Sequence, residues 1–110
     1  MLYLQPESAN RWRLSFIGSV YADEKFFASV ENIHKSASAK DLTLVVDIKR
    51  LDAMSDSCKE VLPHLFRRIK SCGFSRANLD AKRSQNNDFV RVFESVLDCE
   101  FGSDGTISLE

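Results

Sequence analysis

Two histidines and three cysteines are the residues of this sequence best suited to acid–base, nucleophilic or metal chemistry. His34 and His64 fall in different predicted helices, where an isolated histidine is most often a surface or half-buried residue. Cys58, Cys72 and Cys99 lack the close spacing with one another or with a histidine that a zinc site requires. The chain also contains no glycine-rich phosphate loop and no nucleophile or zinc-hydrolase motif. We therefore predict no catalytic residue, no metal, no cofactor and no enzymatic activity.

Cys58 is the one cysteine whose position in the sequence suggests reactivity. It begins a predicted helix and precedes Lys59, and both a helix N-terminus and a nearby cation stabilise a thiolate. It is also the first apolar position of that helix, where a small buried residue packs. The structural role is favoured, and a redox or nucleophilic thiol at Cys58 is kept as an alternative.

Three polar residues, Ser55, Asp56 and Ser57, directly precede Cys58 at the expected start of the helix. Ser and Asp are favoured there because their side-chain oxygens accept hydrogen bonds from free backbone N–H groups. A phosphate is also well tolerated at this position, because the same N–H groups and the helix dipole stabilise negative charge. We interpret the segment as a helix cap and as a candidate phosphorylation switch.

Charge is unevenly distributed along the chain, although 15 basic and 16 acidic residues give a net charge of only −1. The segment 59–83 is mainly basic and the segment 88–110 is mainly acidic. The basic residues are Lys59, Arg67, Arg68, Lys70, Arg76, Lys82 and Arg83. A solvated helix face or an acidic protein partner would account for this polarity. Nucleic acid is not expected as a partner, because aromatic residues do not alternate with the basic ones.

The length of 110 residues suits one domain with a real hydrophobic core. No apolar run approaches the length that spans a bilayer, and no signal peptide is recognisable, so we expect no membrane insertion. An odd number of cysteines without close pairing favours a reducing, cytoplasmic setting over a disulfide framework. The final Leu109-Glu110 resembles a vector-derived tail and is given no weight.

Hydrophobic periodicity and turn residues divide the chain into alternating strands and helices. Strands are predicted at residues 1–5, 11–17, 42–48 and 74–79, with one more short strand in the tail 99–110. Helices are predicted at 22–36, 58–72 and 88–97. The segment 42–48 hardly alternates, which is typical of a central strand buried on both faces. This order favours an α/β domain with right-handed crossovers.

Several single residues set the expected boundaries. Pro6 should end the first strand, 49–57 should be a polar loop, and Gly73 should end the second helix. Pro63 conflicts with that helix, because a proline in a helix interior costs about 3 kcal/mol, so we expect a late start or a kink. One apolar stripe of the first helix should bury Phe26, Phe27, Val30 and Ile33.

The order and length of these elements resemble the STAS domain, the fold of bacterial anti-sigma factor antagonists. In that family a hydrophobic strand ending in Asp leads through a loop to Asp-Ser-Ser-Gly at the start of the second helix. Here Val46-Asp47-Ile48 matches the strand, and Ser55-Asp56-Ser57-Cys58 falls on the motif. The resemblance implies a single STAS-like α/β domain at residues 1–110, with its core at about 11–101. It further implies a mixed sheet of four to five strands with about three helices packed on it.

The resemblance also implies a function. The first Ser of the family motif is phosphorylated by a partner kinase, and Asp56 stands at that position here. Asp56 would then imitate a phosphoserine weakly, or Ser55 or Ser57 would accept the phosphate instead. The implied protein partner is an anti-sigma factor or a serine kinase. The residues expected to contact it are Cys58, Lys59, Arg67 and Lys70. The implied molecule is a non-enzymatic cytoplasmic regulator, monomeric or weakly dimeric.

Two other functions are kept as alternatives. A SpoIIAA-like variant of the fold, related to SEC14 lipid-binding proteins, lacks the motif and would hold a lipid or small apolar ligand in an apolar pocket beneath the helices. A degenerate phospho-receiver domain would use Asp47, at the end of its strand, as phosphoacceptor. The nearest acids upstream, Asp23 and Glu24, lie too close to Asp47 in sequence to complete a receiver's magnesium site.

Overall fold

The computed structural model describes residues 1–36, 41–85 and 87–110, and leaves aside the side chains of residues 30 and 33–36. Within this part of the chain, strands and helices alternate as the sequence predicts. Their order is β1 (Leu2–Ser8), β2 (Arg11–Val20), α1 (Glu24–Ser36), β3 (Leu42–Met54), α2 (Asp56–Ser71), β4 (Phe74–Ala81), α3 (Asn87–Phe101), a short 3-10 helix (Gly102–Asp104) and β5 (Gly105–Leu109). The predicted α/β class is confirmed.

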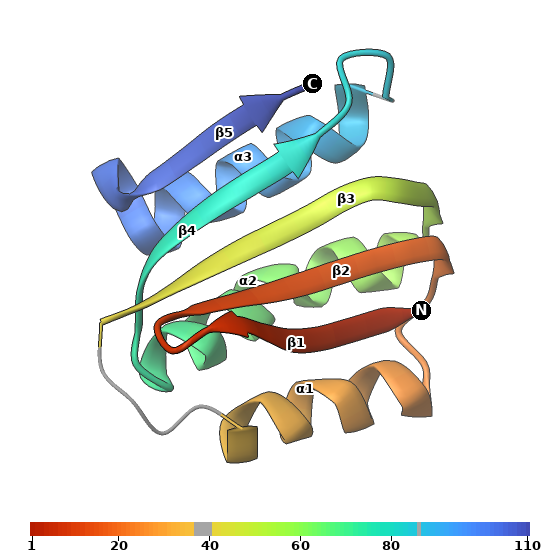
Figure 1. Ribbon diagram of the computed structural model, residues 1–110. Coiled ribbons are helices and arrows are strands. Elements are labelled where there is room, and N and C mark those ends of the chain that lie inside the picture. The colour runs from red at the N-terminus through yellow and green to blue at the C-terminus, as the bar shows by residue number, and fades with distance from the viewer. Residues whose placement is uncertain (37–40, 86) are drawn as a thin grey trace.

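The strands form one mixed sheet in the sequential order β1-β2-β3-β4-β5 (Figure 1). β1 runs antiparallel to β2, and every other neighbouring pair is parallel. Parallel neighbours need a crossover connection, which α1, α2 and α3 supply. The predicted mixed sheet with three packed helices is therefore confirmed.

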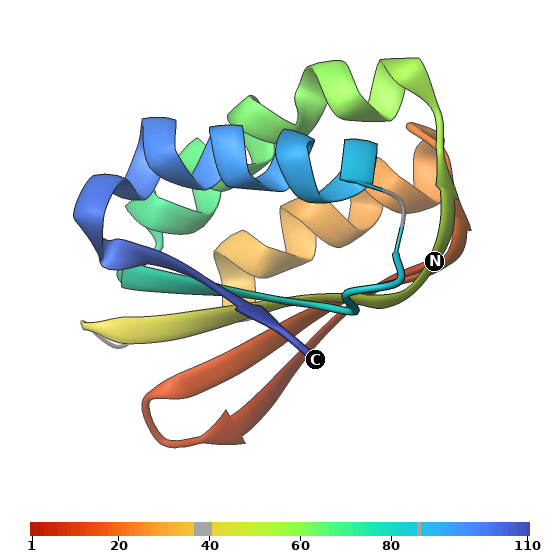
Figure 2. The same ribbon diagram turned by 90° about the horizontal axis from the view of Figure 1, so that it is seen from above.

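All three helices lie on one face of the sheet, and no described segment covers the opposite face (Figure 2). The core fills the space between the helices and the sheet. Phe93 of α3 contacts two other aromatic rings there, with ring centres 5.0 Å from Phe16 of β2 and 6.2 Å from Phe66 of α2. All three rings are 0% exposed. Edge-to-face contacts of this kind join two helices and the sheet in a single core.

β3 is longer than predicted, so the expectation of a polar loop at 49–57 is wrong. The strand continues to pair with β2 as far as Met54, but two register shifts insert extra residues into β3. Such bulges disrupt the two-residue alternation that marks a strand in a sequence. Ile48, Leu51 and Met54 are consequently buried at intervals of three, and none of the residues between them is buried.

Both ends of the chain are more regular than expected. Pro6 lies inside β1, opposite Trp12, because an edge strand leaves one side of its backbone unpaired and tolerates a proline. The expectation that Pro6 ends the strand is wrong. α3 extends to Phe101, and the tail then forms the predicted short strand, in which Leu109 pairs with Ala81 of β4.

α2 is continuous from Asp56 to Ser71 and passes through Pro63, so the expectation of a late start is wrong. Gly73 follows the helix with a φ of +104°, the left-handed conformation predicted for a C-terminal glycine.

The predicted apolar stripe of α1 is correct only in part. Phe26 is buried at 3% exposure, but the adjacent Phe27 is 48% exposed because it points to another side of the helix. The predicted stripe members Val30 and Ile33 lie outside the described side chains, as does His34.

Candidate functional site

The N-terminal end of α2 follows β3 directly, with Ser55 as the single connecting residue. Ser55 has the extended backbone of a helix cap (φ −67°, ψ 154°), and its Oγ accepts a hydrogen bond from the backbone N–H of Cys58 at 3.2 Å. The Oγ atoms of Ser55 and Ser57 are also 3.2 Å apart. The predicted capping role is therefore present in the structure, and it belongs to Ser55.

Asp56 and Ser57 form the exposed first turn of α2. The Asp56 side chain is 99% exposed, and its Oδ1 lies 3.9 Å from Nζ of Lys59. Ser57 is exposed as well. The first backbone N–H groups of a helix have no partner within the helix, and they point out of this turn. Negative charge added here would meet both these groups and the positive end of the helix dipole.

Cys58 lies directly behind this exposed turn and is 0% exposed. Burial raises the pKa of its thiol to about 11, and this outweighs the opposing effect of the chain's terminal amino group. The thiol is therefore protonated near neutral pH, and the expectation that its position would stabilise a thiolate is wrong. The structure places Cys58 in the core beneath the candidate surface.

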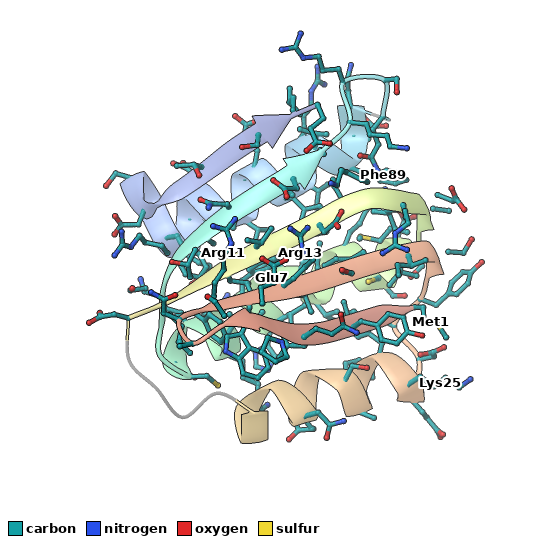
Figure 3. All side chains as sticks on the ribbon, viewed as in Figure 1. Met1, Glu7, Arg11, Arg13, Lys25 and Phe89 are labelled. Carbon is teal, nitrogen blue, oxygen red and sulfur yellow. The ribbon has the colours of Figure 1, made fainter. Side chains whose placement is uncertain are left out.

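Lys59 joins the N-terminal ends of α2 and α3. Its Nζ lies 6.0 Å from the ring centre of Phe89, which is labelled in Figure 3. This distance is at the outer limit of a cation–π contact. The contact leaves the ammonium beside the exposed turn of Asp56 and Ser57, so these three residues form one small surface, called here the α2 N-terminal surface.

Arg67 and Lys70, two predicted partner-binding residues, lie near the other end of α2 and contact α3. Nε of Arg67 is 3.0 Å from Oε1 of Glu100, and Nζ of Lys70 donates to the Glu100 carbonyl at 2.7 Å. Lys70 also lies over the ring of Phe101, 5.8 Å from its centre. Ser57 and Lys70 are thirteen positions apart along the helix, a distance of about 20 Å. The structure thus divides the predicted contact residues into two separate groups.

A charged cluster on the uncovered face of the sheet was not recognised in the sequence. Arg13 is its centre: Nη1 lies 2.9 Å from Oδ2 of Asp47 and 3.4 Å from Oδ2 of Asp80, and Nε donates to Glu7. Glu7 also pairs with Arg11 at 3.2 Å. Figure 3 shows Glu7, Arg11 and Arg13 in front of the sheet. The hydrogen bond to Glu7 is the main cause that raises the pKa of Arg13 above its ordinary value.

Asp47 is not placed as a receiver phosphoacceptor. It lies in the interior of β3, is 7% exposed, and accepts the Lys49 backbone N–H at 3.0 Å as well as the Arg13 hydrogen bond. The expectation that the strand ends at Asp47 is wrong. The sheet order also differs from the 2-1-3-4-5 order of receiver-type folds. The one signal in the sequence was a charged residue within the most hydrophobic strand.

The described residues contain no group of three or more His, Cys, Asp or Glu side chains arranged to hold a metal ion. None of the described helices is long and apolar enough to cross a membrane.

This chain is similar to known proteins in its structure, whereas comparison of its sequence finds no match. No family model and no curated protein matches the sequence. Among solved structures, the Bacillus cell fate determinant SpoIIAA in its phosphorylated form aligns with 100% of this chain and 93% of its own, at a TM-score of 0.63 and 16% identity. The unphosphorylated anti-sigma factor antagonist SpoIIAA aligns with 86% of this chain and 82% of its own, at a TM-score of 0.53 and 17% identity.

A third similar structure is an uncharacterised protein from Shewanella loihica PV-4 with a SpoIIAA-like fold. It aligns with 100% of this chain and 84% of its own, at a TM-score of 0.57 and 13% identity. Such low identities establish architecture and leave function to the residues of this chain. The predicted resemblance to the STAS domain is confirmed at the level of the fold: this chain has the fold of SpoIIAA.

Proposed function

We propose that this protein is a non-enzymatic regulator that binds a protein partner through the α2 N-terminal surface, formed by Asp56, Ser57 and Lys59. The observation that supports this most directly is the exposure of Asp56 and Ser57 on the first turn of α2, whereas two of the predicted contact residues, Arg67 and Lys70, contact Glu100 of α3. SpoIIAA is described as an anti-sigma factor antagonist, and it exists in phosphorylated and unphosphorylated forms. An anti-sigma factor or a serine kinase is therefore the class of partner we propose.

Ser57 is the hydroxyl we propose as the phosphate acceptor. Ser55 uses its Oγ to accept the Cys58 N–H, whereas Ser57 is exposed and its Oγ lies 3.2 Å from the Ser55 Oγ. Ser57 also stands on the first turn of α2, whose backbone N–H groups have no partner within the helix. A phosphate on Ser57 would add a charge of roughly −1.5 to −2 next to Asp56. Partner binding would then weaken, because the added charge must be desolvated in the interface or repels an acidic partner.

The test compares wild-type protein with Ser57→Glu as baits in native cytoplasmic extract, followed by mass spectrometry of the bound proteins and of the bait. Ser103→Glu is the matched control, because Ser103 is an exposed serine on the short helix Gly102–Asp104, which follows the C-terminal end of α3 and lies far from the α2 N-terminal surface. We expect a sigma-regulatory protein or a kinase bound to wild type and to Ser103→Glu. With the purified partner, Ser57→Glu should raise Kd by about tenfold.

Phosphate found on Ser57 of the recovered bait would support the switch directly. Equal binding by wild type and Ser57→Glu, together with equal binding by Asp56→Ala, would remove this surface from the interface. Phosphate on Ser55 alone would contradict the assignment of the acceptor while leaving the surface in place.

A further inference from the structure

A cavity of about 380 Å³ lies between the N-terminal part of α1 and the adjoining edge of the sheet, away from the α2 N-terminal surface. It is lined by Met1, Leu2, Ser19, Val20, Tyr21, Asp23, Lys25, Phe26 and Ser29. Figure 3 shows Met1 at the start of β1 and Lys25 near the start of α1, at the same end of the sheet. The volume falls in the range of small-molecule sites, about 300–1,000 Å³.

The floor of this cavity is apolar and belongs to the core. Leu2, Val20 and Phe26 are 9%, 2% and 3% exposed, so the floor is part of the packed core. Its rim is apolar as well, since Met1 is 64% and Tyr21 57% exposed. Exposed apolar side chains that gather on a surface are one mark of a ligand-binding groove.

The polar groups of the lining differ in whether they already have partners. Oδ1 of Asp23 accepts the Phe26 backbone N–H at 2.9 Å and so caps α1, and Oγ of Ser29 donates to the Lys25 carbonyl at 2.9 Å. Among the described residues, the Lys25 ammonium takes part in none of the observed ion pairs. Asp23 keeps its negative charge while it caps α1, but the lining also holds two cations, Lys25 and the Met1 terminal ammonium, which donates to the Ile17 carbonyl at 2.8 Å. The charges of the lining therefore sum to one excess positive charge, and Lys25 carries the one that is not held by a hydrogen bond or ion pair of the described residues.

We propose that this cavity binds a small amphipathic carboxylate, with its apolar body against Leu2, Val20 and Phe26 and its carboxylate at Lys25. At roughly 30 Å³ for each small group, the cavity accepts on the order of a dozen non-hydrogen atoms, the size of a medium-chain or aromatic acid. The inference goes beyond the proposed partner binding and involves none of its residues.

The test is an NMR titration of isotopically labelled full chain with three probes that share one tail: octanoate, 1-octanol and octylamine. Octanoate should shift the backbone amides of Val20, Phe26 and Ser29 in a saturable manner, with a Kd of about 1 mM or tighter. 1-Octanol should bind more weakly by about threefold, and octylamine more weakly still, because neither gains the attraction to Lys25.

Two variants and one control locate the site. Lys25→Gln should make octanoate bind about as weakly as 1-octanol, because the loss of an exposed ion pair costs about threefold in Kd. Ser29→Leu should fill the cavity and weaken all three probes. Lys82→Gln removes an exposed lysine of the β4–α3 connection and should change nothing.

The proposal is overturned if octanoate causes no saturable shifts, or if its shifts lie outside the cavity. It is also overturned if octylamine binds as tightly as octanoate, or if Lys25→Gln leaves the preference for octanoate intact. Lys25 is exposed on the first turn of α1, so this last comparison does not depend on whether Ser29→Leu folds.

Discussion

The two faces of the sheet bury their central residues by different means. On the covered face, apolar side chains such as Val46 and Leu79, both 0% exposed, pack beneath three helices. On the uncovered face, Val45 and Asp47 are 0% and 7% exposed although no described helix lies over them. Parallel strands are ordinarily covered on both sides. Here the long side chain of Arg13, held by carboxylates from β1, β3 and β4, supplies the cover on the second side.

The largest effect should come from the covered face. Phe93→Ala removes a ring that contacts β2 and α2 together, and we expect the free energy of unfolding to fall by about 4 kcal/mol. Phe27→Ala, at a ring that is 48% exposed, is the matched control and should cost less than about 1 kcal/mol. Urea unfolding followed by circular dichroism measures both losses. If Phe93→Ala does not fold, Phe93→Leu should still cost about 1.5 kcal/mol. Equal losses at Phe93 and Phe27 would contradict the assigned core.

A loss of about 2–3 kcal/mol should follow from Arg13→Met on the uncovered face. The variant leaves the Asp47 and Asp80 carboxylates, which are direct neighbours across β3 and β4, without their shared cation. Like charges opposite one another in a sheet are destabilising. Chemical denaturation measures the loss. Arg11→Met is the matched control, because the Arg11 side chain is 46% exposed and its ion pair, within the part of the chain that the structure describes, is with Glu7.

The double variant Arg13→Met/Asp47→Asn should recover part of this loss, because one of the two unpaired charges is gone. A double variant no more stable than Arg13→Met alone would mean that Arg13 acts through packing and not through its charge. That result would mean that packing buries residues on both faces, and it would remove the contrast between them.

The covered face was the part of the fold that sequence patterns predicted well. The spacing of Leu62, Leu65, Phe66 and Ile69 identified α2, and the uninterrupted run 42–48 identified the central strand. Both signals arise because burial under helices imposes a hydrophobic period. The second half of β3 was missed because its bulges shift the buried positions away from the two-residue period that marks a strand. The prediction that Pro6 ends the first strand failed because an edge strand tolerates a proline. Whether β1 lies at the edge is a property of the whole sheet and not of the local sequence.

Of the candidate site, the sequence predicted the local features but not the contacts between distant segments. Ser55 was recognised as a cap because capping depends on local chain geometry. The separation of Arg67 and Lys70 from the α2 N-terminal surface depends on Glu100, and the Arg13 cluster joins residues from three strands. Contacts between distant segments leave no local pattern in a single sequence. The cavity beside α1 was likewise beyond prediction, because the two segments that line it pack together only in the folded chain.

Alkaline pH should destabilise the covered side through Cys58. Its folded-state pKa of about 11 lies above the usual value of 9.0, so the folded thiol retains its proton after the unfolded thiol has lost it. This contribution is fully present below about pH 9 and is lost as pH rises through about 11. Between these values we expect a loss of about 2 kcal/mol that is absent in Cys58→Ala. Denaturant unfolding from neutral to alkaline pH provides the measurement, and Cys99→Ala, at an exposed cysteine, should retain the full pH dependence. Identical pH profiles for wild type and Cys58→Ala would contradict the burial of this thiol.

The smallest effect should come from the rim of the uncovered face. Glu7→Gln removes an exposed carboxylate that pairs with Arg11 and Arg13, and exposed ion pairs contribute less than about 1 kcal/mol. This loss should disappear at about 1 M salt, where charges are screened within a few ångströms. The loss in Arg13→Met should persist in the same salt, because Asp47 is buried and little screened. Unfolding of both variants at low and high salt therefore separates the rim of the cluster from its centre. Equal salt sensitivity would mean that Asp47 is as open to solvent as Glu7, and the polar cover proposed for this face would not exist.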